Sequence, residues 1–113
     1  MRNLQRNQRV EAYATANASG TATPVVEVKQ GPSWEVKQIS ISVTGSTTLP
    51  KCDTYLGRNS AGVFISHSET GDADTDSSPN ITARSGDSLC AVFTQVTPGI
   101  ECKMTVVYDE VGY

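Results

Sequence analysis

Residues 33–43 read SWEVKQISISV, and the alternation of apolar and polar residues changes phase halfway along this stretch. Trp34 and Val36 are apolar at even positions, whereas the apolar residues from Ile39 to Val43 stand at odd positions. Successive side chains of a regular strand point to opposite faces, so an uninterrupted strand would divide these residues between two faces. The change of phase therefore predicts a β-bulge, or a strand that passes from one sheet to another, as at the corners of β-sandwiches.

Alternation of the same kind continues along the chain on both sides of this stretch. It marks residues 24–29, 51–57, 62–68, 80–83, 88–96 and 101–110, and turn-forming residues separate these segments. Residues 88–108 are predicted to form a hairpin about the sequence TPGI, in which Gly99 can adopt a positive φ angle. No internal segment shows a convincing helical period.

This pattern predicts an all-β chain that forms a single β-sandwich of about seven to eight short strands. Jelly-roll and immunoglobulin-like arrangements both fit it and both remain open. The length of 113 residues is that of one domain. The parity of neighbouring strands places in the predicted core Trp34, Leu89, Phe93, Met104 and Val106.

The first 20 residues differ in composition from the rest, being rich in Asn, Gln, Arg and Ala and poor in large apolar residues. Such a segment cannot readily order itself, because fixing each residue costs about 1–2 kcal/mol of conformational entropy. We predict an extended or partly helical assembly arm at 1–20 that orders only against a partner, followed by a sandwich domain at 21–113. The residues predicted to bind that partner are Arg2, Leu4, Arg6, Arg9, Val10 and Tyr13.

The charge is divided unevenly along the chain. The net charge is −3, yet the first ten residues carry three arginines and no acid, while 6 basic and 12 acidic residues follow. A basic segment on an acidic body suits an acidic protein surface, whereas the body would repel phosphate, so no nucleic-acid partner is expected. The start lacks the apolar region of a signal peptide, and no apolar run approaches the roughly 20 residues that span a bilayer, so no membrane contact is expected.

Three cysteines, Cys52, Cys90 and Cys102, occur in segments predicted to be strands. An odd number cannot pair completely within one chain, and zinc-binding spacings are missing because there is no C-x-x-C and a single histidine. We therefore predict buried thiols in a protein that folds in a reducing cytosol.

Residues 71–80, GDADTDSSPN, contain the spaced carboxylates of Asp72, Asp74 and Asp76. An EF-hand loop also needs glycine at its sixth position and glutamate at its twelfth, where this chain has serine and alanine. A looser calcium site at these three aspartates is a weak alternative. The favoured interpretation is a water-facing loop of turn-forming residues, with no cofactor.

His67 and Trp34 are the other residues that could carry chemistry. His67 stands at the end of a predicted strand without a nucleophile motif, so a solvent-facing role is favoured over pairing with a distant cysteine or aspartate for catalysis. Trp34 is interpreted as a core anchor, with a ligand platform as the alternative. The sequence thus predicts that the protein is not an enzyme.

Several motifs together resemble those of small virion proteins of tailed bacteriophages. They are WEVKQISI from Trp34, YLG from Tyr55, GDADTD from Gly71, SGDSLCAVF from Ser85 and TPGI from Thr97, followed by a final VVY. The resemblance covers residues 25–108, and this chain has Phe93 where the pattern of the family has tryptophan. None of these motifs is catalytic.

The resemblance implies a structural virion protein, above all a capsid decoration (minor capsid or cement) protein that attaches in many copies through its N-terminal arm. Implied partners are the major capsid protein or other head or tail components, together with further copies of the chain, as in a trimer. Its location would be the virion, assembled in the cytoplasm of the host bacterium. The alternative is a tail or head-fibre protein that contacts the host surface or a glycan through the acidic segment and Trp34.

Overall fold

The computed structural model describes residues 3–28, 31, 33–45, 50–57, 63–68, 73–76 and 81–112, with backbone alone for 3–7, 63, 66, 68, 73–76 and 112. Its strands are β1 (Asn3–Thr15), β2 (Val25–Glu27), β3 (Ser33–Val43), β4 (Lys51–Leu56), β5 (Val63–Ser68), β6 (Ala73–Asp76), β7 (Ile81–Ala83), β8 (Ser88–Thr94) and β9 (Glu101–Gly112). The predicted all-β class is confirmed. Over these residues there is no helix long and apolar enough to cross a membrane.

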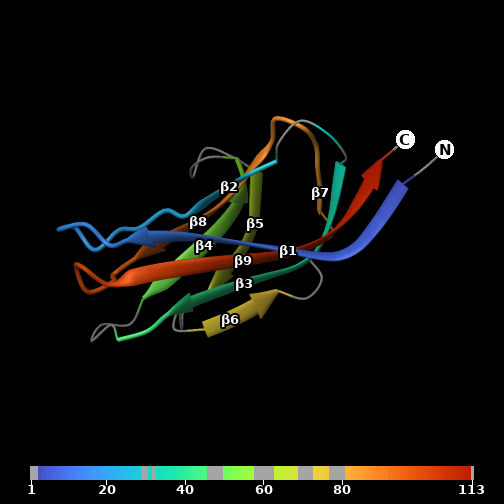
Figure 1. The fold of residues 1–113 in the computed structure, drawn as a ribbon. Helices are drawn as coiled ribbons and strands as arrows, with labels where there is room; N and C mark the ends of the chain where they lie inside the picture. Colours follow the sequence, from blue (N-terminus) through green and yellow to red (C-terminus); the bar gives the residue numbers. More distant parts are fainter. Residues whose placement is uncertain are drawn as a thin grey trace.

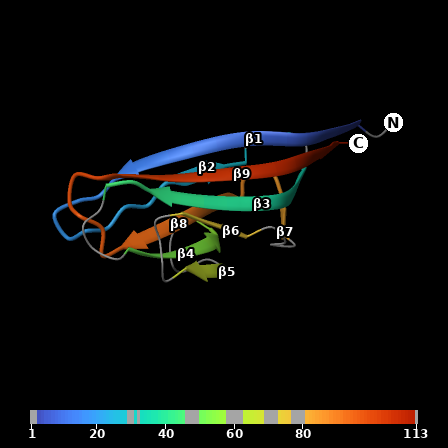
Figure 2. The same cartoon turned by 90° about the horizontal axis from the view of Figure 1, so that it is seen from below.

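The strands form two antiparallel sheets that face each other, so the predicted β-sandwich is confirmed. One sheet has the order β1-β9-β3-β6, with β7 also paired to β3, and the other has the order β2-β8-β4-β5. Figure 2 shows the layers, with β1, β9 and β3 in one and β8, β4 and β5 in the other. Among the described strands, β4 and β5 are the single pair of sequence neighbours that are also hydrogen-bonded neighbours. The chain therefore crosses between the sheets at most of its connections.

The hairpin predicted for residues 88–108 is wrong, because β8 and β9 lie in different sheets. Each has a partner on both sides: β8 lies between β2 and β4, and β9 lies between β1 and β3. The turn between them is a corner tied to the β1–β2 connection, with Gly99 N donating to Ala16 O at 2.9 Å and Val96 N donating to Gly20 O at 3.1 Å. Alternation shows which side chains are buried, but a hairpin and a corner share the same pattern.

The β-bulge predicted in residues 33–43 is confirmed. The register between β3 and β9 shifts between Val36 and Gln38, which leaves Lys37 as the extra residue. As a result, both apolar sets of β3 face the core, where they are at most 9% exposed: Trp34, Val36, Ile39, Ile41 and Val43. The ring of Trp34 stacks on that of Tyr108, with centroids 3.7 Å apart and planes 9° apart. Trp34 is thus a core residue, and its alternative role as a ligand platform is wrong.

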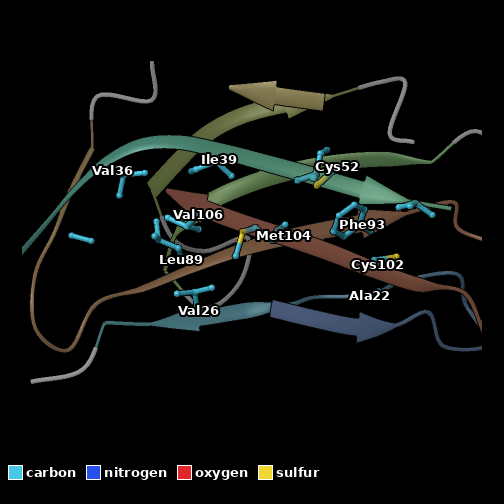
Figure 3. Close-up of a cluster of buried hydrophobic side chains, with 14 of the residues drawn as sticks. Ala22, Val26, Val36, Ile39, Cys52, Leu89, Phe93, Cys102, Met104 and Val106 are labelled. Carbon is cyan, nitrogen blue, oxygen red and sulfur yellow. The ribbon is translucent and has the colours of Figure 1, made fainter. Parts of the chain in front are cut away.

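The core lies between the two sheets, and side chains from both sheets point toward one another there (Figure 3). Leu89 and Phe93 of β8 meet Met104 and Val106 of β9, and all four are fully buried. Together with Trp34, these residues are the predicted core, which is confirmed.

The three cysteines are buried free thiols, as predicted from their place in the strands. Burial raises the pKa of Cys90, and burial together with the charge of Glu101 raises the pKa of Cys102 to about 11. The thiols of Cys90 and Cys102 therefore stay protonated at physiological pH, and all three cysteines serve as core packing.

The predicted independent arm is wrong for residues 3–15, which form an edge strand of the sandwich. Strand β1 pairs with β9 from Asn3 opposite Gly112 to Thr15 opposite Glu101, and Figure 1 shows the two strands side by side with both chain ends together. Between residues 8 and 15, small or apolar residues that pack on the core alternate with exposed polar ones. Alanine is a weak strand former, so this alternation does not mark a strand in the sequence.

Replacing each of the two phenylalanines by alanine in turn should distinguish a core position from a surface position. Phe93 is fully buried and Phe64 is 55% exposed. Phe93→Ala should lower the free energy of unfolding by about 3–5 kcal/mol, because it leaves a cavity between the sheets. Phe64→Ala should change it by roughly 0.5 kcal/mol or less. Urea denaturation of both variants measures the difference, and equal losses would contradict the core assignment.

The corner between the sheets depends on Gly20. Its φ is +76°, and a Cβ added there would lie 2.7 Å from the carbonyl oxygen of Val96, whereas Gly86 has φ +91° and no atom within 4 Å of an added Cβ. Gly86→Ala should therefore lower the free energy of unfolding by only about 1–2 kcal/mol of backbone strain. Gly20→Ala should lower it clearly more, because the Val96 carbonyl must also move. Denaturation curves that rank the variants the other way would show that this corner is not tightly packed.

Candidate assembly interface

Strand β1 forms one edge of the β1-β9-β3-β6 sheet. In the part of the chain that the structure describes, β9 is its one sheet partner, so its other backbone edge is not covered by a strand. The strand is 13 residues long, whereas β6 and β7, which pair with β3 at the opposite edge, have 4 and 3 residues. Long edge strands offer backbone donors and acceptors to another chain, and short ones do so far less. The edge of β1 is therefore the better candidate for pairing with another protein chain.

A row of polar side chains lies on the outer face of β1 and is centred on Glu11. Its carboxylate accepts a hydrogen bond from the Tyr13 hydroxyl at 2.7 Å and lies 3.2 Å from Lys103 Nζ and 3.7 Å from Arg9 Nε. The Tyr13 hydrogen bond, and then that of Lys103, lowers the pKa of Glu11, and the same bond raises the pKa of Tyr13. Glu11 therefore stays ionised and Tyr13 stays neutral over the physiological range.

The predicted partner-binding residues are all on or next to β1, but they do not share one face. Arg9 and Tyr13 are exposed on the outer face, and the side chain of Tyr13 is one of the large apolar groups left in water, at 54% exposure. Val10 instead packs partly buried against the core, so it makes its apolar contact within its own chain.

The remaining predicted contacts lie at the start of the strand. Leu4 is opposite Val111, and Arg6 falls in the irregularity between Gln5 and Gln8, both known from the backbone only. Arg2 lies outside the described residues. Their role as partner contacts stays a prediction.

The acidic segment is partly a strand rather than the predicted water-facing loop. Residues 73–76 form β6, with Asp74 opposite Ile41 and Asp76 opposite Ile39 of β3. Strand pairing uses the backbone, so turn-forming side chains did not prevent it. Asp72 lies outside the described residues, and among the described ones the structure shows no group of His, Cys, Asp and Glu that could hold a metal ion. The calcium alternative therefore stays untested.

A second polar cluster lies on the outer face of the other sheet. The register of β4 and β5 puts Asp53 opposite His67, and Asp53 Oδ1 pairs with His67 Nδ1. The hydroxyl of Tyr55 donates to Asp53 Oδ2 at 3.5 Å, and the ring of Tyr55 meets that of Phe64 edge-on, with centroids 5.8 Å apart. The Asp53–His67 pair could not be predicted from the sequence, because its members are 14 positions apart and only the strand register brings them together.

This cluster presents an exposed aromatic ring beside hydrogen-bonding groups. His67 is 40% exposed at its side chain, so the predicted solvent-facing histidine is confirmed, although it is held by Asp53. Burial, and then the nearby charge of Asp53, raises the pKa of Tyr55, which keeps it a neutral donor. Such a surface suits a ligand with an apolar face and polar edges. Catalysis would in addition need a nucleophile or a bound substrate within reach of the imidazole.

The row of polar side chains centred on Glu11 should make the stability of the fold depend on pH in the acid range. The pKa of Glu11 is below its ordinary value of 4.5. A carboxylate of this kind stabilises the fold above its unfolded pKa, and the contribution is lost as the pH falls through its folded pKa. Glu11→Gln should therefore lower the melting temperature at neutral pH, and the difference should vanish well below pH 4.5.

Glu35→Gln is the matched control, because it removes an exposed carboxylate of β3 that belongs to no part of this row. Thermal melts from neutral to acid pH would contradict the assignment if the two glutamine variants followed the same pH dependence.

No protein-family model matches the chain, and no curated protein matches its sequence. Solved structures do resemble it. A chain of the acid-stable capsid of Helicobacter pylori bacteriophage KHP30 is 16% identical, with 96% of this chain and 92% of that chain covered and a TM-score of 0.60. Chitosan-binding module 1 of a Paenibacillus sp. IK-5 chitosanase/glucanase is 11% identical, with 91% and 98% covered and a TM-score of 0.54.

A family 89 glycoside hydrolase from Clostridium perfringens also matches, at 12% identity and a TM-score of 0.50, but the match covers only 14% of that chain. At identities this low the likeness shows the fold alone. The chain therefore has a β-sandwich fold that also occurs in a bacteriophage capsid and in a carbohydrate-binding module.

Proposed function

We propose that this protein is a structural component of a tailed-bacteriophage particle, namely a capsid decoration protein attached in many copies. The observation that carries the proposal is the match to a chain of the KHP30 capsid, which extends over nearly the whole of both chains. The strand order supports it. If β6 and β7 count as one interrupted strand beside β3, the alternation between the sheets is that of a jelly roll, an architecture common in viral capsid and lectin domains.

In this proposal, attachment uses the surface of a folded sandwich. The N-terminal segment belongs to the sheet through its pairing with β9. Arg9 and Tyr13 on the outer face of β1 are then the described contacts to the capsid or to other virion proteins, and Leu4 and Arg6 extend the same strand. Buried thiols are compatible with assembly in the reducing cytoplasm of a host bacterium. The protein performs no catalytic step in this role.

A second candidate is a fibre or tail component that binds a glycan of the host surface. The exposed Phe64, edge-on to Tyr55 and beside Asp53 and His67, favours it. Aromatic rings flanked by hydrogen-bonding groups can stack on the apolar face of a sugar ring. The likeness to a chitosan-binding module agrees with this candidate at the level of the fold.

Antibody labelling of purified particles tests the first proposal. Gold particles bound to an antibody against this chain should be distributed over the capsid shell in negative-stain images of the phage that encodes it. Label confined to the tail or fibres would contradict a decoration role and favour the second candidate.

A glycan array tests the second candidate directly. The parent chain and Phe64→Ala should bind equally weakly if the role is structural. Retained binding of one glycan class by the parent chain, and its loss in Phe64→Ala, would assign the β4–β5 face to sugar recognition instead.

A further inference from the structure

The part of β1 best suited to pairing with another chain is Gln8–Thr15. Its register with β9 is irregular between Gln5 and Gln8 and regular from there to the end of the strand. The core-facing positions are neutral, at Gln8, Val10, Ala12 and Ala14, and the segment contains no proline. Natural edge strands are protected by charged side chains, proline, inward-pointing charge, bulges or short length. The regular part of β1 carries the outward-facing charges of Arg9 and Glu11 but none of the other devices.

The charges of this segment complement each other when it pairs with itself. Arg9 and Glu11 flank Val10 and are both on the outer face. In an antiparallel pair centred on Val10, Arg9 of each copy lies directly opposite Glu11 of the other, so two opposite-charge pairs form. Centring the pair on Glu11 would put two carboxylates opposite each other, and centring it on Ala12 would put Glu11 opposite Tyr13. Opposite charges in direct cross-strand pairs stabilise and like charges destabilise, so the charges select Val10.

We propose that β1 pairs with β1 of a second copy of this chain, antiparallel and two-fold symmetric about Val10. The inference deepens the proposed function, on which it rests for its setting in a particle. The two sheets that contain β1 would then join into one continuous sheet. The pairing would cover the partly exposed inner side chains of Val10 and Ala12. It would also place the exposed Tyr13 diagonally from Arg9 of the second copy, where a cation–π contact can form.

Charge exchange tests the proposed register in the isolated full chain. Sedimentation equilibrium of the parent protein should show a concentration-dependent dimer. Arg9→Glu and Glu11→Arg each turn two attractive pairs into repulsive ones and should raise the dissociation constant roughly tenfold. The double variant Arg9→Glu/Glu11→Arg restores both pairs and should restore the dimer.

Lys103→Gln is the matched control. Lys103 lies on β9 and contacts Glu11 at 3.2 Å, but it is not on the free edge of β1. Its loss disturbs the same carboxylate within the chain and should leave the dissociation constant within about twofold, in line with the small energies of exposed ion pairs. A parent protein that stays monomeric at every concentration, or a dimer that the charge exchange leaves unchanged, would overturn the proposal.

Cysteine crosslinking tests the centre of symmetry independently. In the proposed pair, residue 10 of one copy lies opposite residue 10 of the other. The Cα atoms of these two residues would be about 4.5–5.5 Å apart, within the range of a disulfide. Val10→Cys should therefore give a disulfide-linked dimer under mild oxidation. Ala12→Cys should not, because its two copies would be offset by about 13 Å along the strands. The native cysteines are buried and do not compete. Crosslinking of Ala12→Cys in preference to Val10→Cys would overturn the register.

These measurements use the protein without a phage particle, so the two proposals can fail separately. Loss of capsid labelling together with an intact dimer would contradict the decoration role alone. Capsid labelling by a protein that is monomeric in solution, with no crosslink at Val10→Cys, would contradict the strand pairing alone.

Discussion

The one-residue bulge in β3 is the constraint on which the rest of the sandwich depends. Without it, either Trp34 and Val36 or the apolar residues that follow would face water. The bulge also turns its extra residue, Lys37, outward, where its Nζ lies 3.5 Å from the carboxylate of the buried Asp109. A buried carboxylate without a partner would cost several kcal/mol. One inserted residue therefore keeps the apolar side chains before and after it on the same face of β3. The same residue also provides a cation for Asp109 on β9.

The bulge has a counterpart on the other side of β9. Strand β1 also gains one residue against β9, between Gln5 and Gln8, at nearly the same level as Lys37. Both neighbours of β9 thus change register together, which keeps inner faces aligned across three strands. This arrangement makes β9 the central strand and leaves β1 as the sheet edge. The N-terminal segment is therefore part of the folded domain, and any assembly role it has must be exercised by a strand whose register is already set.

The sequence predicted the features that depend on one strand at a time. The alternation of apolar and polar residues along a single strand was enough to predict the β3 bulge and the burial of Phe93 and Met104. It was not enough for features that depend on which strands are neighbours. The turn before β9 looked like a hairpin, the weak alternation of Val10 and its neighbouring alanines looked like an arm, and nothing marked Asp53 as the partner of a histidine. Each depends on contacts between distant segments, which carry no local signal.

The two edges of the β1-β9-β3-β6 sheet explain why pairing through β1 would produce a closed assembly. A two-fold pair uses the same patch on both copies and therefore ends with two chains. At the opposite edge of the same sheet, growth would have to use β6 and β7, strands of 4 and 3 residues, of which β6 contains Asp74 and Asp76. Short strands that carry charge are poor templates for further pairing. One edge of this sheet is thus long and self-complementary in charge, while the other is short and acidic, so the proposed pairing would favour a closed dimer over a fibre.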